Sequence, residues 1–325
     1  MSKPGPLRRL NIISNDIGFG LSRNIRLVRP MLEARGWRVD VHGYQPLPFG
    51  ERTRRTVRRL VDRRSAYDVN LFFEFVVPSW FSHARANVLI PNQEWFREGA
   101  ERHLKRFDLV LCKTRHGEAI FQGLGCRTSF VSFTTVDRRT PVAAHDRRGL
   151  FHLAGRSLQK GTAALVALWA AHPEWPTLTI VQHPERATVV DLPNVRWVVN
   201  YIPDDELLAL QNRHGIHLQP SEVEGFGHAI VEGLSCGAVV VPTDAAPMNE
   251  IVTAERGLLA AWRDSSPMRL GTAYRVDPDA LARCIDQALG LDDSAHDRLG
   301  AAARAWYDDN DRYFRRHLME ALDGV

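Results

Sequence analysis

The sequence contains few cysteines and no long apolar run, and each absence excludes a class of protein. Its 325 residues include four cysteines, and none of them forms a C-x-x-C pair. No cluster of His and Cys has the spacing of a zinc site, so we interpret the cysteines as reduced thiols of a cytoplasmic protein. No apolar segment is long enough for a signal peptide or a membrane span. The cysteines are Cys112, Cys126, Cys236 and Cys284.

Internal repeats and low-complexity tracts are also missing, which argues against a solenoid or a disordered chain. The apolar fraction is 44% and the charged fraction is 25%, both ordinary for a globular protein. A chain of this length is expected to form two domains, each able to bury its own core.

Positive charge is present but unevenly distributed. The formal net charge is +4 and the isoelectric point is about 9.0. Residues 51–64 predict a basic amphipathic helix, in which Val57, Leu60 and Val61 form an apolar stripe. Such a helix suits an anionic membrane surface or a phosphorylated acceptor, and a solvated helix face packed on its own sheet is the alternative. No aromatic or RNA-binding motif accompanies it, so nucleic acid is not expected. Its arginines are Arg52, Arg54, Arg55, Arg58, Arg59, Arg63 and Arg64.

Residues 215–241 predict a strand, a loop, a helix and a second strand. Residues 215–219 form the end of a short strand, and residues 222–227 form a polar loop that contains glycine. Residues 229–236 favour a helix, and residues 238–241 form an apolar β-branched run typical of a buried parallel strand. In such a unit the loop faces the N-terminus of the helix, where free N–H groups and the helix dipole favour an anion.

Two glutamates belong to this segment. Glu224 lies in the loop, and Glu232 follows eight residues later on the predicted helix. Carboxylates accept hydrogen bonds, and sugar or ribose hydroxyls supply donors. The segment therefore predicts a site for a ligand with both phosphate and hydroxyl groups, and a chance pair of surface glutamates is the alternative.

The same residues resemble the E-x7-E signature of GT-B glycosyltransferases, especially the retaining family 4. This resemblance implies that Glu232 binds the ribose hydroxyls and that Glu224 binds the hydroxyls of the donor sugar. It also implies retention of configuration, with the departing phosphate taking the acceptor proton, so that no protein base is required. His228 is a candidate base, or a loop histidine at the cleft. The residues that carry the resemblance are Pro220, Ser221, Glu224, Gly225, Phe226, Gly227, Glu232, Cys236 and Gly237.

A second element, residues 155–161, follows the apolar residues 151–154. Arg156 and Lys160 lie four residues apart at a predicted helix start, so both can reach one anion. The element resembles the family's Gly-Arg-x-x-x-x-Lys-Gly motif, which holds the donor diphosphate. We predict that both cations stabilise charge on the leaving group. A solvated basic pair is the alternative.

Other expectations come from the resemblance alone. It implies that the backbone near Tyr201 and Ile202 holds the nucleobase. Relatives usually carry two glycines where this chain has Ala245 and Ala246. Neither a metal nor a cofactor is implied, because the Asp-x-Asp at residues 277–279 sits at a helix start and is interpreted as a cap.

The N-terminal half opens with a predicted strand over residues 10–14 and a glycine turn at Gly18 and Gly20. With Asp40 roughly twenty residues further on, this turn is similar to a dinucleotide-binding fingerprint. Arg23 occupies the place of the third glycine. The glycosyltransferase resemblance instead places Gly18 and Gly20 near the donor phosphates and the acceptor.

Polar residues lie inside or directly after two further apolar runs of this half. Glu74 lies in the apolar run 69–77, and Asn92 and Glu94 follow the strand predicted at residues 88–91. Polar groups just after a parallel strand lie on the ligand side of the sheet. Relatives commonly have a histidine here that touches the donor sugar, and this chain has none in register. We therefore predict that Glu74, Asn92 and Glu94 line the sugar or acceptor side.

The expected fold is α/β of the GT-B type, with two facing Rossmann-like domains. Residues 1–145 form the acceptor-side domain, residues 150–300 bind the nucleotide-sugar donor, and the helix at residues 301–325 crosses back onto the first domain.

The expected function is transfer of a sugar from a nucleoside-diphosphate sugar to an acceptor hydroxyl. The acceptor would be a glycan or a lipid-linked molecule in cell-surface polysaccharide or glycolipid synthesis. The location would be the cytoplasm, at the inner face of the membrane. A dinucleotide oxidoreductase, a non-catalytic nucleotide-sugar-binding subunit and a sugar-nucleotide epimerase remain alternatives. The nucleotide, the sugar and the acceptor do not follow from the residues.

Overall fold

The structure is a computed structural model that describes residues 8–14, 20–43, 65–142 and 144–325. By compactness the chain divides into two units. Unit 1 consists of Met1–Phe133 and Arg312–Val325, and unit 2 of Thr134–Asp311. One of the two boundaries falls inside a single helix, α9 (Asp293–Asp323). The domain boundaries predicted from the sequence stay predictions.

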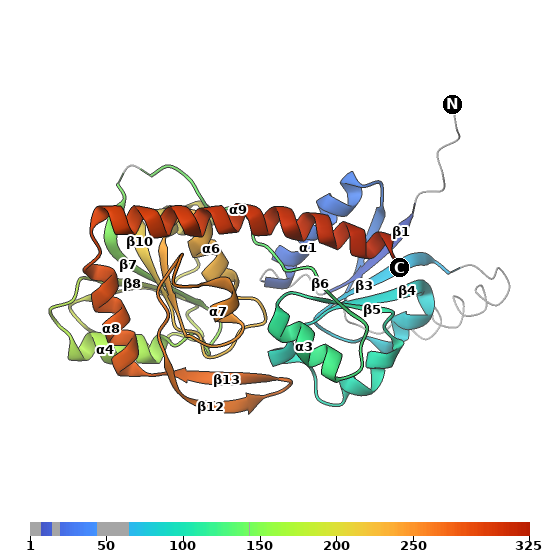
Figure 1. The fold of residues 1–325 in the computed structure, drawn as a ribbon, viewed down its shortest axis with the longest axis horizontal. Helices are drawn as coiled ribbons and strands as arrows, with labels where there is room; N and C mark the ends of the chain where they lie inside the picture. The colour runs from blue at the N-terminus through green and yellow to red at the C-terminus, as the bar shows by residue number, and fades with distance from the viewer. Residues whose placement is uncertain (1–7, 15–19, 44–64, 143) are drawn as a thin grey trace. The chain divides into compact units, whose positions relative to one another are not determined.

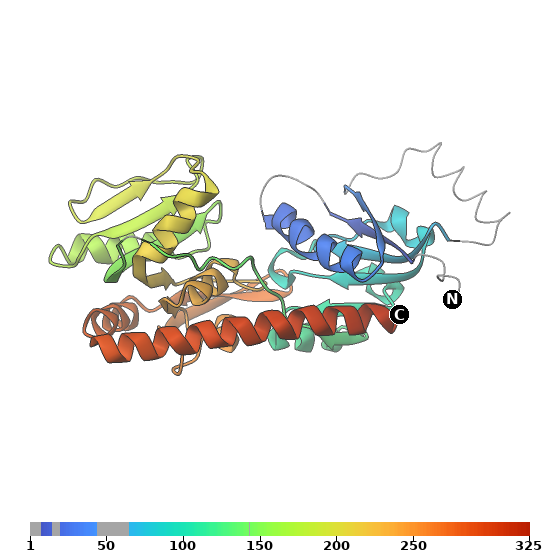
Figure 2. The same cartoon turned by 90° about the horizontal axis from the view of Figure 1, so that it is seen from above.

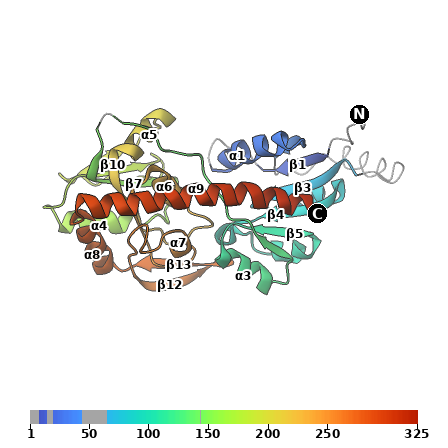
Figure 3. The same cartoon turned by 45° about the horizontal axis from the view of Figure 1, so that its top comes forward.

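Unit 1 contains a six-stranded parallel sheet in the order β2-β1-β3-β4-β5-β6. Helix α1 (Gly20–Ala34) connects β1 to β2, and α3 (Arg115–Gly123) connects β5 to β6. These two connections lead in opposite directions along the sheet, so right-handed crossovers place the two helices on opposite faces (Figure 3). The strands are β1 (Arg9–Ile13), β2 (Arg38–His42), β3 (Tyr67–Phe73), β4 (Ala84–Ile90), β5 (Leu109–Cys112) and β6 (Thr128–Phe130). The short 3-10 helices are η1 (Pro78–His83), η2 (Gln93–Trp95) and η3 (Ala100–Arg106).

The last turns of α9 belong to unit 1 and lie along its sheet (Figure 2). Phe314 is fully buried, and its ring lies 4.8 Å from that of Phe133. At the end of the helix, Asp323 Oδ1 accepts a 2.7 Å hydrogen bond from Arg8 Nη1, just before β1. Apolar burial on this helix face therefore holds the C-terminal residues to the first unit of the chain.

Unit 2 contains a five-stranded parallel sheet in the order β11-β10-β7-β8-β9. Its strands are β7 (Asp146–Gly155), β8 (Leu178–Gln182), β9 (Val195–Val198), β10 (His214–Gln219) and β11 (Val239–Pro242). Its helices besides α9 are α4 (Thr162–Ala171), α5 (Asp204–Arg213), α6 (His228–Cys236), α7 (Met248–Ile251) and α8 (Pro278–Leu289). An antiparallel hairpin of β12 (Trp262–Met268) and β13 (Gly271–Val276) lies outside the sheet (Figure 1).

Apolar residues cover both faces of this sheet. Trp169 of α4 and Ile285 of α8 belong to one buried cluster, and these two helices lie side by side (Figure 1). Leu207 and Leu210 of α5 pack on Phe151 in a second cluster. Burial on both faces explains why the strands were recognisable as continuous apolar runs.

The two parallel Rossmann-like sheets confirm the α/β prediction. Helix α8 (Pro278–Leu289) begins at the helix start that was predicted at residues 277–279. The apolar run 69–77 was too long for one strand, because β3 ends at Phe73 and leaves Glu74 in the following loop. The C-terminal segment is one helix that begins at Asp293, before the predicted start.

Candidate functional site

The candidate site in unit 2 is formed by the loops that follow two neighbouring strands. Residues 156–161 follow β7, and residues 220–227 follow β10. Because these strands are adjacent and parallel, both loops open at the carboxyl edge of the sheet. The N–H of Glu222 donates a 2.8 Å hydrogen bond to the carbonyl of Gln159, which joins the two loops.

Gly161 allows this close approach. Its φ is +74°, and a Cβ atom at this position would lie 2.2 Å from the carbonyl oxygen of Pro220. A larger residue would meet both a steric clash and a strained backbone. The glycine of the predicted Lys-Gly motif is thus required by the contact between the loops.

Lys160 and Glu224 form an ion pair between the two loops. Lys160 Nζ contacts Glu224 Oε1, and the two side chains are 16% and 10% exposed. Ser221 Oγ donates a 2.7 Å hydrogen bond to the same oxygen. Thr243 Oγ1 in turn donates a 2.8 Å bond to the carbonyl of Ser221, which fixes the loop. The pair is partly desolvated, so its charges interact more strongly than at the protein surface.

His152 on β7 connects the elements from which these two loops extend. It is fully buried, with Nδ1 2.7 Å from the carbonyl of Leu218 and Nε2 2.9 Å from Thr162 Oγ1. Burial lowers the pKa of His152 to about 4, and the nearby charge of Lys160 acts in the same direction. The imidazole is therefore neutral near pH 7: Nδ1–H donates to Leu218, and Nε2 accepts from Thr162. This histidine ties β7 and β10 to the start of α4.

The helices that begin at the site lack side-chain caps. The N-cap residues of α4 and α6 are Gly161 and Gly227, both left-handed and without a capping hydrogen bond. Elsewhere Thr114 caps α3 and Asp277 caps α8. The cap predicted at Asp277 is confirmed by its 2.8 Å hydrogen bond from the N–H of Ala280. An uncapped N-terminus keeps N–H groups available to an anion, so both helix starts at the site favour one.

Arg156 has a different carboxylate partner from Lys160. Its Nη2 lies 2.6 Å from Glu185 Oε2, and the two side chains are 40% and 65% exposed. This ion pair is at the surface, where a single pair contributes little to stability. The prediction that Arg156 and Lys160 hold one anion stays a prediction.

The remaining predicted donor residues lie around the start of α6 and before α5. Phe226 is buried, and its ring meets the edge of His228, 5.6 Å away. Gly225 and Gly227 flank Phe226 in the loop, which is buried. Tyr201 is 87% exposed, whereas Ile202 packs against the Phe151 cluster. Their assignments to the donor and the acceptor stay predictions.

Glu232 is 1% exposed on α6. Its Oε2 accepts a 2.8 Å hydrogen bond from Gln211 Nε2, and its Oε1 lies 3.5 Å from Thr135 Oγ1. The sequence analysis did not single out Gln211 or Thr135, because neither belongs to the E-x7-E pattern. Helix α5 and the segment before β7 bring them to the glutamate.

Unit 1 brings Glu74 and Asn92 together at the carboxyl edge of its own sheet. Asn92 Nδ2 donates a 2.7 Å hydrogen bond to Glu74 Oε1, and Lys113 Nζ donates a 2.6 Å bond to Asn92 Oδ1. Glu94 is buried nearby and interacts electrostatically with Lys113. Lys113 was not predicted as a site residue; it lies directly after β5, and this position alone names no partner.

Burial controls the ionisation of this cluster. It raises the pKa of Glu74, and the charge of Lys113 opposes that shift. Burial also lowers the pKa of Lys113, and Glu74 and Glu94 oppose that shift. Glu74 has a φ of +64°, a left-handed conformation that costs energy for any residue other than glycine. Strain of this kind is concentrated at functional sites.

Other predicted residues lie elsewhere. Gly18 and the arginines of residues 52–64 are outside the described residues, and Gly20 is the first residue of α1. Asp40 lies in the middle of β2, where its Oδ2 accepts a 3.0 Å bond from Arg9 Nη2. The acid on which a dinucleotide site would depend is therefore engaged within the sheet.

Neither a metal cluster nor a membrane helix is found where the structure describes the chain. There, no group of three or more His, Cys, Asp or Glu side chains could hold a metal ion. Among the described residues, no helix combines the length and apolarity needed to cross a bilayer.

Comparisons with known proteins bear on the family and the fold. Residues 185–306 match the family described as glycosyl transferases group 1, a range that includes Glu224 and Glu232. Comparison with curated proteins finds no match.

Solved structures show the fold. Sucrose-phosphate synthase from Thermosynechococcus elongatus aligns with a TM-score of 0.74 at 18% identity, covering 98% of both chains. A glycosyltransferase from Rickettsia africae gives 0.73 at 13%, again covering 98% of both chains. Anabaena HepE in complex with UDP and glucose gives 0.70 at 17%, covering 98% of this chain and 100% of the other.

The predicted GT-B fold is confirmed, and the family match supports the predicted glycosyltransferase class.

Proposed function

We propose that this chain transfers a sugar from a nucleoside-diphosphate sugar to an acceptor hydroxyl. The observation that carries the proposal is the Lys160–Glu224 pair at the uncapped starts of α4 and α6. It places positive potential for a diphosphate beside a carboxylate that accepts hydrogen bonds from sugar hydroxyls. The match of residues 185–306 to glycosyl transferases group 1 supports the same chemistry.

The diphosphate gains negative charge as the glycosidic bond breaks. Lys160 and the first-turn N–H groups of α4 and α6 would stabilise that charge, with Arg156 as a second cation. Glu224 would hold the sugar hydroxyls, Glu232 the ribose hydroxyls, and the backbone near Tyr201 the nucleobase. Configuration would be retained, with the departing phosphate accepting the proton of the acceptor.

The acceptor side would lie at the Glu74–Asn92 pair of unit 1, because polar groups follow three neighbouring strands there. We propose an acceptor that is a glycan or a lipid-linked molecule, in cell-surface polysaccharide or glycolipid synthesis. The protein would work in the cytoplasm at the inner face of the membrane. The arginines of residues 52–64 support an anionic surface as partner.

Two structural neighbours are described with uridine nucleotides: HepE with UDP and glucose, and trehalose-6-phosphate from E. coli with UDP-2-fluoro glucose. UDP is therefore the first nucleotide to test. Thermal unfolding would be followed with UDP, GDP, ADP, TDP, CMP, NAD and NADP. We expect one nucleoside diphosphate to stabilise the protein by about 2.7 kcal/mol at a hundredfold excess over its dissociation constant.

The same titration on variants tests the site. Lys160→Met should lose the response and Arg156→Ala should weaken it. Arg147→Met should keep it, because Arg147 pairs with Asp297 on the surface of unit 2. A response only to NAD or NADP would overturn the proposal and move the site to Gly18, Gly20 and Asp40.

Vesicle flotation tests the membrane partner. Binding should require anionic lipid and should fall when salt is raised. Equal flotation with neutral and anionic vesicles would contradict the membrane proposal and leave the transfer proposal standing.

A further inference from the structure

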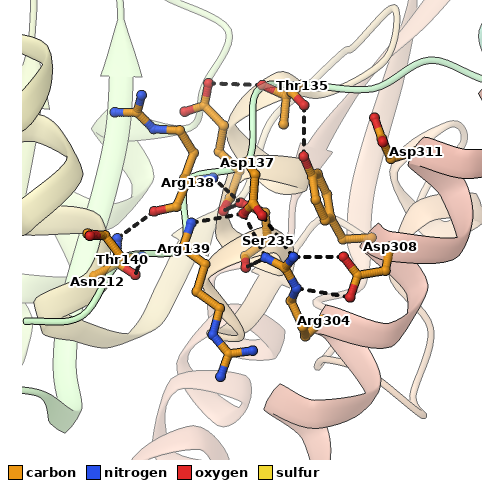
Figure 4. Close-up of polar contacts among 12 residues, drawn as sticks. Thr135, Asp137, Arg138, Arg139, Thr140, Asn212, Ser235, Arg304, Asp308 and Asp311 are labelled. Atoms are coloured by element: carbon orange, nitrogen blue, oxygen red, sulfur yellow. Dashed lines mark hydrogen bonds and ion pairs between the residues drawn. The ribbon is translucent and has the colours of Figure 1, made fainter. Parts of the chain in front are cut away.

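The segment that enters unit 2, residues 135–140, is fastened to helices on both sides of it. We call these residues the entry segment. The carboxylate of Asp137 accepts hydrogen bonds from Nη1 and Nη2 of Arg304, at 2.6 and 2.8 Å (Figure 4). Arg304 also donates to the carbonyl of Ser235 on α6 and to Asp308 on α9. The entry segment therefore has a fixed position against α6, the helix that carries Glu232.

Arg138 is the most deeply anchored residue of the entry segment and is 4% exposed. Its backbone N–H donates a 3.1 Å hydrogen bond to Ser235 Oγ (Figure 4). Its Nη1 lies 3.0 and 2.9 Å from the two carboxylate oxygens of Asp204, which balances its charge. Its Nε donates a 2.7 Å bond to Gln211 Oε1. The backbone N–H and the guanidinium nitrogens of this buried arginine therefore all donate to groups of unit 2.

Gln211 transmits this arrangement to Glu232. A guanidinium has donors and no acceptor, so only the oxygen of the amide can face Arg138. The amide nitrogen then points at Glu232 Oε2, 2.8 Å away. Without the arginine, the amide could rotate and present its oxygen to the carboxylate. Arg138 thus fixes which end of Gln211 meets Glu232.

The contact between Glu232 and Thr135 is weaker than the contact with Gln211. Thr135 Oγ1 lies 3.5 Å from Oε1, at the limit of a hydrogen bond. Tyr307 OH holds the Thr135 backbone by a 2.9 Å bond to its carbonyl. Glu232 is nevertheless almost fully buried, and a buried carboxylate needs well-placed donors. Gln211, at 2.8 Å, is a stronger donor to this carboxylate than Thr135.

We infer that Arg138 and Gln211 are positioning residues that aim the Glu232 carboxylate at the ribose hydroxyls of the donor. This inference rests on the proposed function, which assigns Glu232 to the ribose. A carboxylate has about four lone-pair sites, so Glu232 can accept hydrogen bonds from ribose hydroxyls while it accepts one from Gln211. The chain Arg138, Gln211, Glu232 makes discrimination between ribose and deoxyribose depend on the entry segment.

The test compares a ribonucleotide with its 2′-deoxy counterpart by calorimetry. The probes are UDP and dUDP, or the corresponding pair for whichever diphosphate stabilises the wild type. One hydrogen bond to a charged group contributes about 1.5–3 kcal/mol, so the wild type should prefer UDP by roughly 10- to 150-fold. In Gln211→Leu and Arg138→Met, UDP affinity should fall about tenfold or more while dUDP affinity changes little.

Controls separate positioning from folding. Arg147→Met removes a surface arginine of the same unit and should keep the wild-type preference. Arg138→Lys keeps the charge opposite Asp204 but loses the planar fork, so it should fold and show an intermediate preference. Equal loss of UDP and dUDP affinity in the Gln211 and Arg138 variants would assign them a structural role and overturn the inference.

A Glu232→Gln variant distinguishes failure of the inference from failure of the assignment. If the wild type binds UDP and dUDP equally and Glu232→Gln changes neither, the ribose assignment itself is wrong. If Glu232→Gln abolishes the preference but Gln211→Leu and Arg138→Lys keep it, the assignment stands and the positioning inference is wrong.

Discussion

Each unit places a lysine beside a carboxylate at the carboxyl edge of its sheet, but the two arrangements differ. In unit 2, Lys160 contacts Glu224 directly, and the side chain of Lys160 is 16% exposed while that of Glu224 is 10% exposed. In unit 1, Lys113 reaches Glu74 only through the amide of Asn92, and Lys113 is 4% exposed. A direct, partly exposed ion pair can exchange one partner for a ligand phosphate. A buried lysine with a bridging amide cannot do so without leaving buried charges uncompensated.

The helices that begin near the two lysines also differ, in whether a side chain caps their N-terminus. Helices α4 and α6 of the Lys160 site begin without a side-chain cap, whereas Thr114, directly after Lys113, caps α3. In unit 2 the helices at the candidate site are uncapped while α8, away from it, is capped by Asp277, and in unit 1 the helix that follows Lys113 is capped. The comparison supports the proposal that Lys160 binds the ligand, whereas Lys113 holds Asn92 and Glu74 in place.

The largest expected effect is on stability, in Lys113→Met. Removing this buried cation leaves Glu74 and Glu94 without it, and breaking a buried pair typically costs about 3–5 kcal/mol. Chemical denaturation should show a loss of that size for unit 1. Lys105→Met, at an exposed lysine of the same unit, is the matched control and should change little. A Lys113→Met variant as stable as the wild type would contradict the structural role that distinguishes Lys113 from Lys160.

The next largest effect is on activity, in Lys160→Met. If this lysine stabilises the leaving diphosphate, its loss should lower kcat by roughly 10²–10³. The melting temperature should change far less than in Lys113→Met, because solvent reaches the site. Turnover of the donor identified by thermal shift provides the measurement. A variant with normal kcat would mean that the Lys160–Glu224 pair is structural.

Acid should affect stability in opposite directions through the buried histidines of unit 2 and through Glu74 of unit 1. Burial lowers the pKa of His152 and His217 in unit 2 to about 4, below the value near 6.5 of an unfolded chain. Between these values the unfolded state binds more protons, so each histidine costs about 1.4 kcal/mol per unit of falling pH. In unit 1 the raised pKa of Glu74 makes the folded state bind its proton first, which adds stability as pH falls.

Hydrogen exchange at pH 7, 6 and 5 would compare the units after correction for intrinsic rates. Peptides from β10 should lose protection as pH falls, and those from β3 should not. His217→Gln should flatten the pH dependence in unit 2 because it removes one titrating group. Equal loss of protection in β3 and β10 would contradict the comparison.

Much of the fold could be predicted because its signals are local. The apolar run of β5, the cap at Asp277 and the glycine-bounded α6 each depend on a few adjacent residues. The end of β3 could not be predicted, since Glu74 leaves the strand through a left-handed turn inside an apolar run. The hairpin of β12 and β13 was missed because its exposed strands carry no apolar run.

The residues of the candidate site also differ in whether the sequence alone marks them. Lys160, Glu224 and Glu232 were found because family-like spacing marks them in the sequence. Arg138 and Gln211 were missed because their partners lie up to 97 residues away and meet only in the folded unit. Lys113 was missed for a different reason, since a lysine after a strand predicts no particular partner. Spacing thus marks the residues proposed to face the ligand, whereas the residues proposed to orient them depend on tertiary contacts.

The smallest expected effect tests the division between capped and uncapped helices. Asp277→Ala removes the cap of α8, and Thr114→Ala removes that of α3. Each should lower the free energy of unfolding by about 1 kcal/mol. Neither should change nucleotide affinity, because the proposed anion site uses α4 and α6. If Asp277→Ala weakened UDP binding as strongly as Lys160→Met, capped helices would also serve the ligand. The absence of caps on α4 and α6 would then carry no functional meaning.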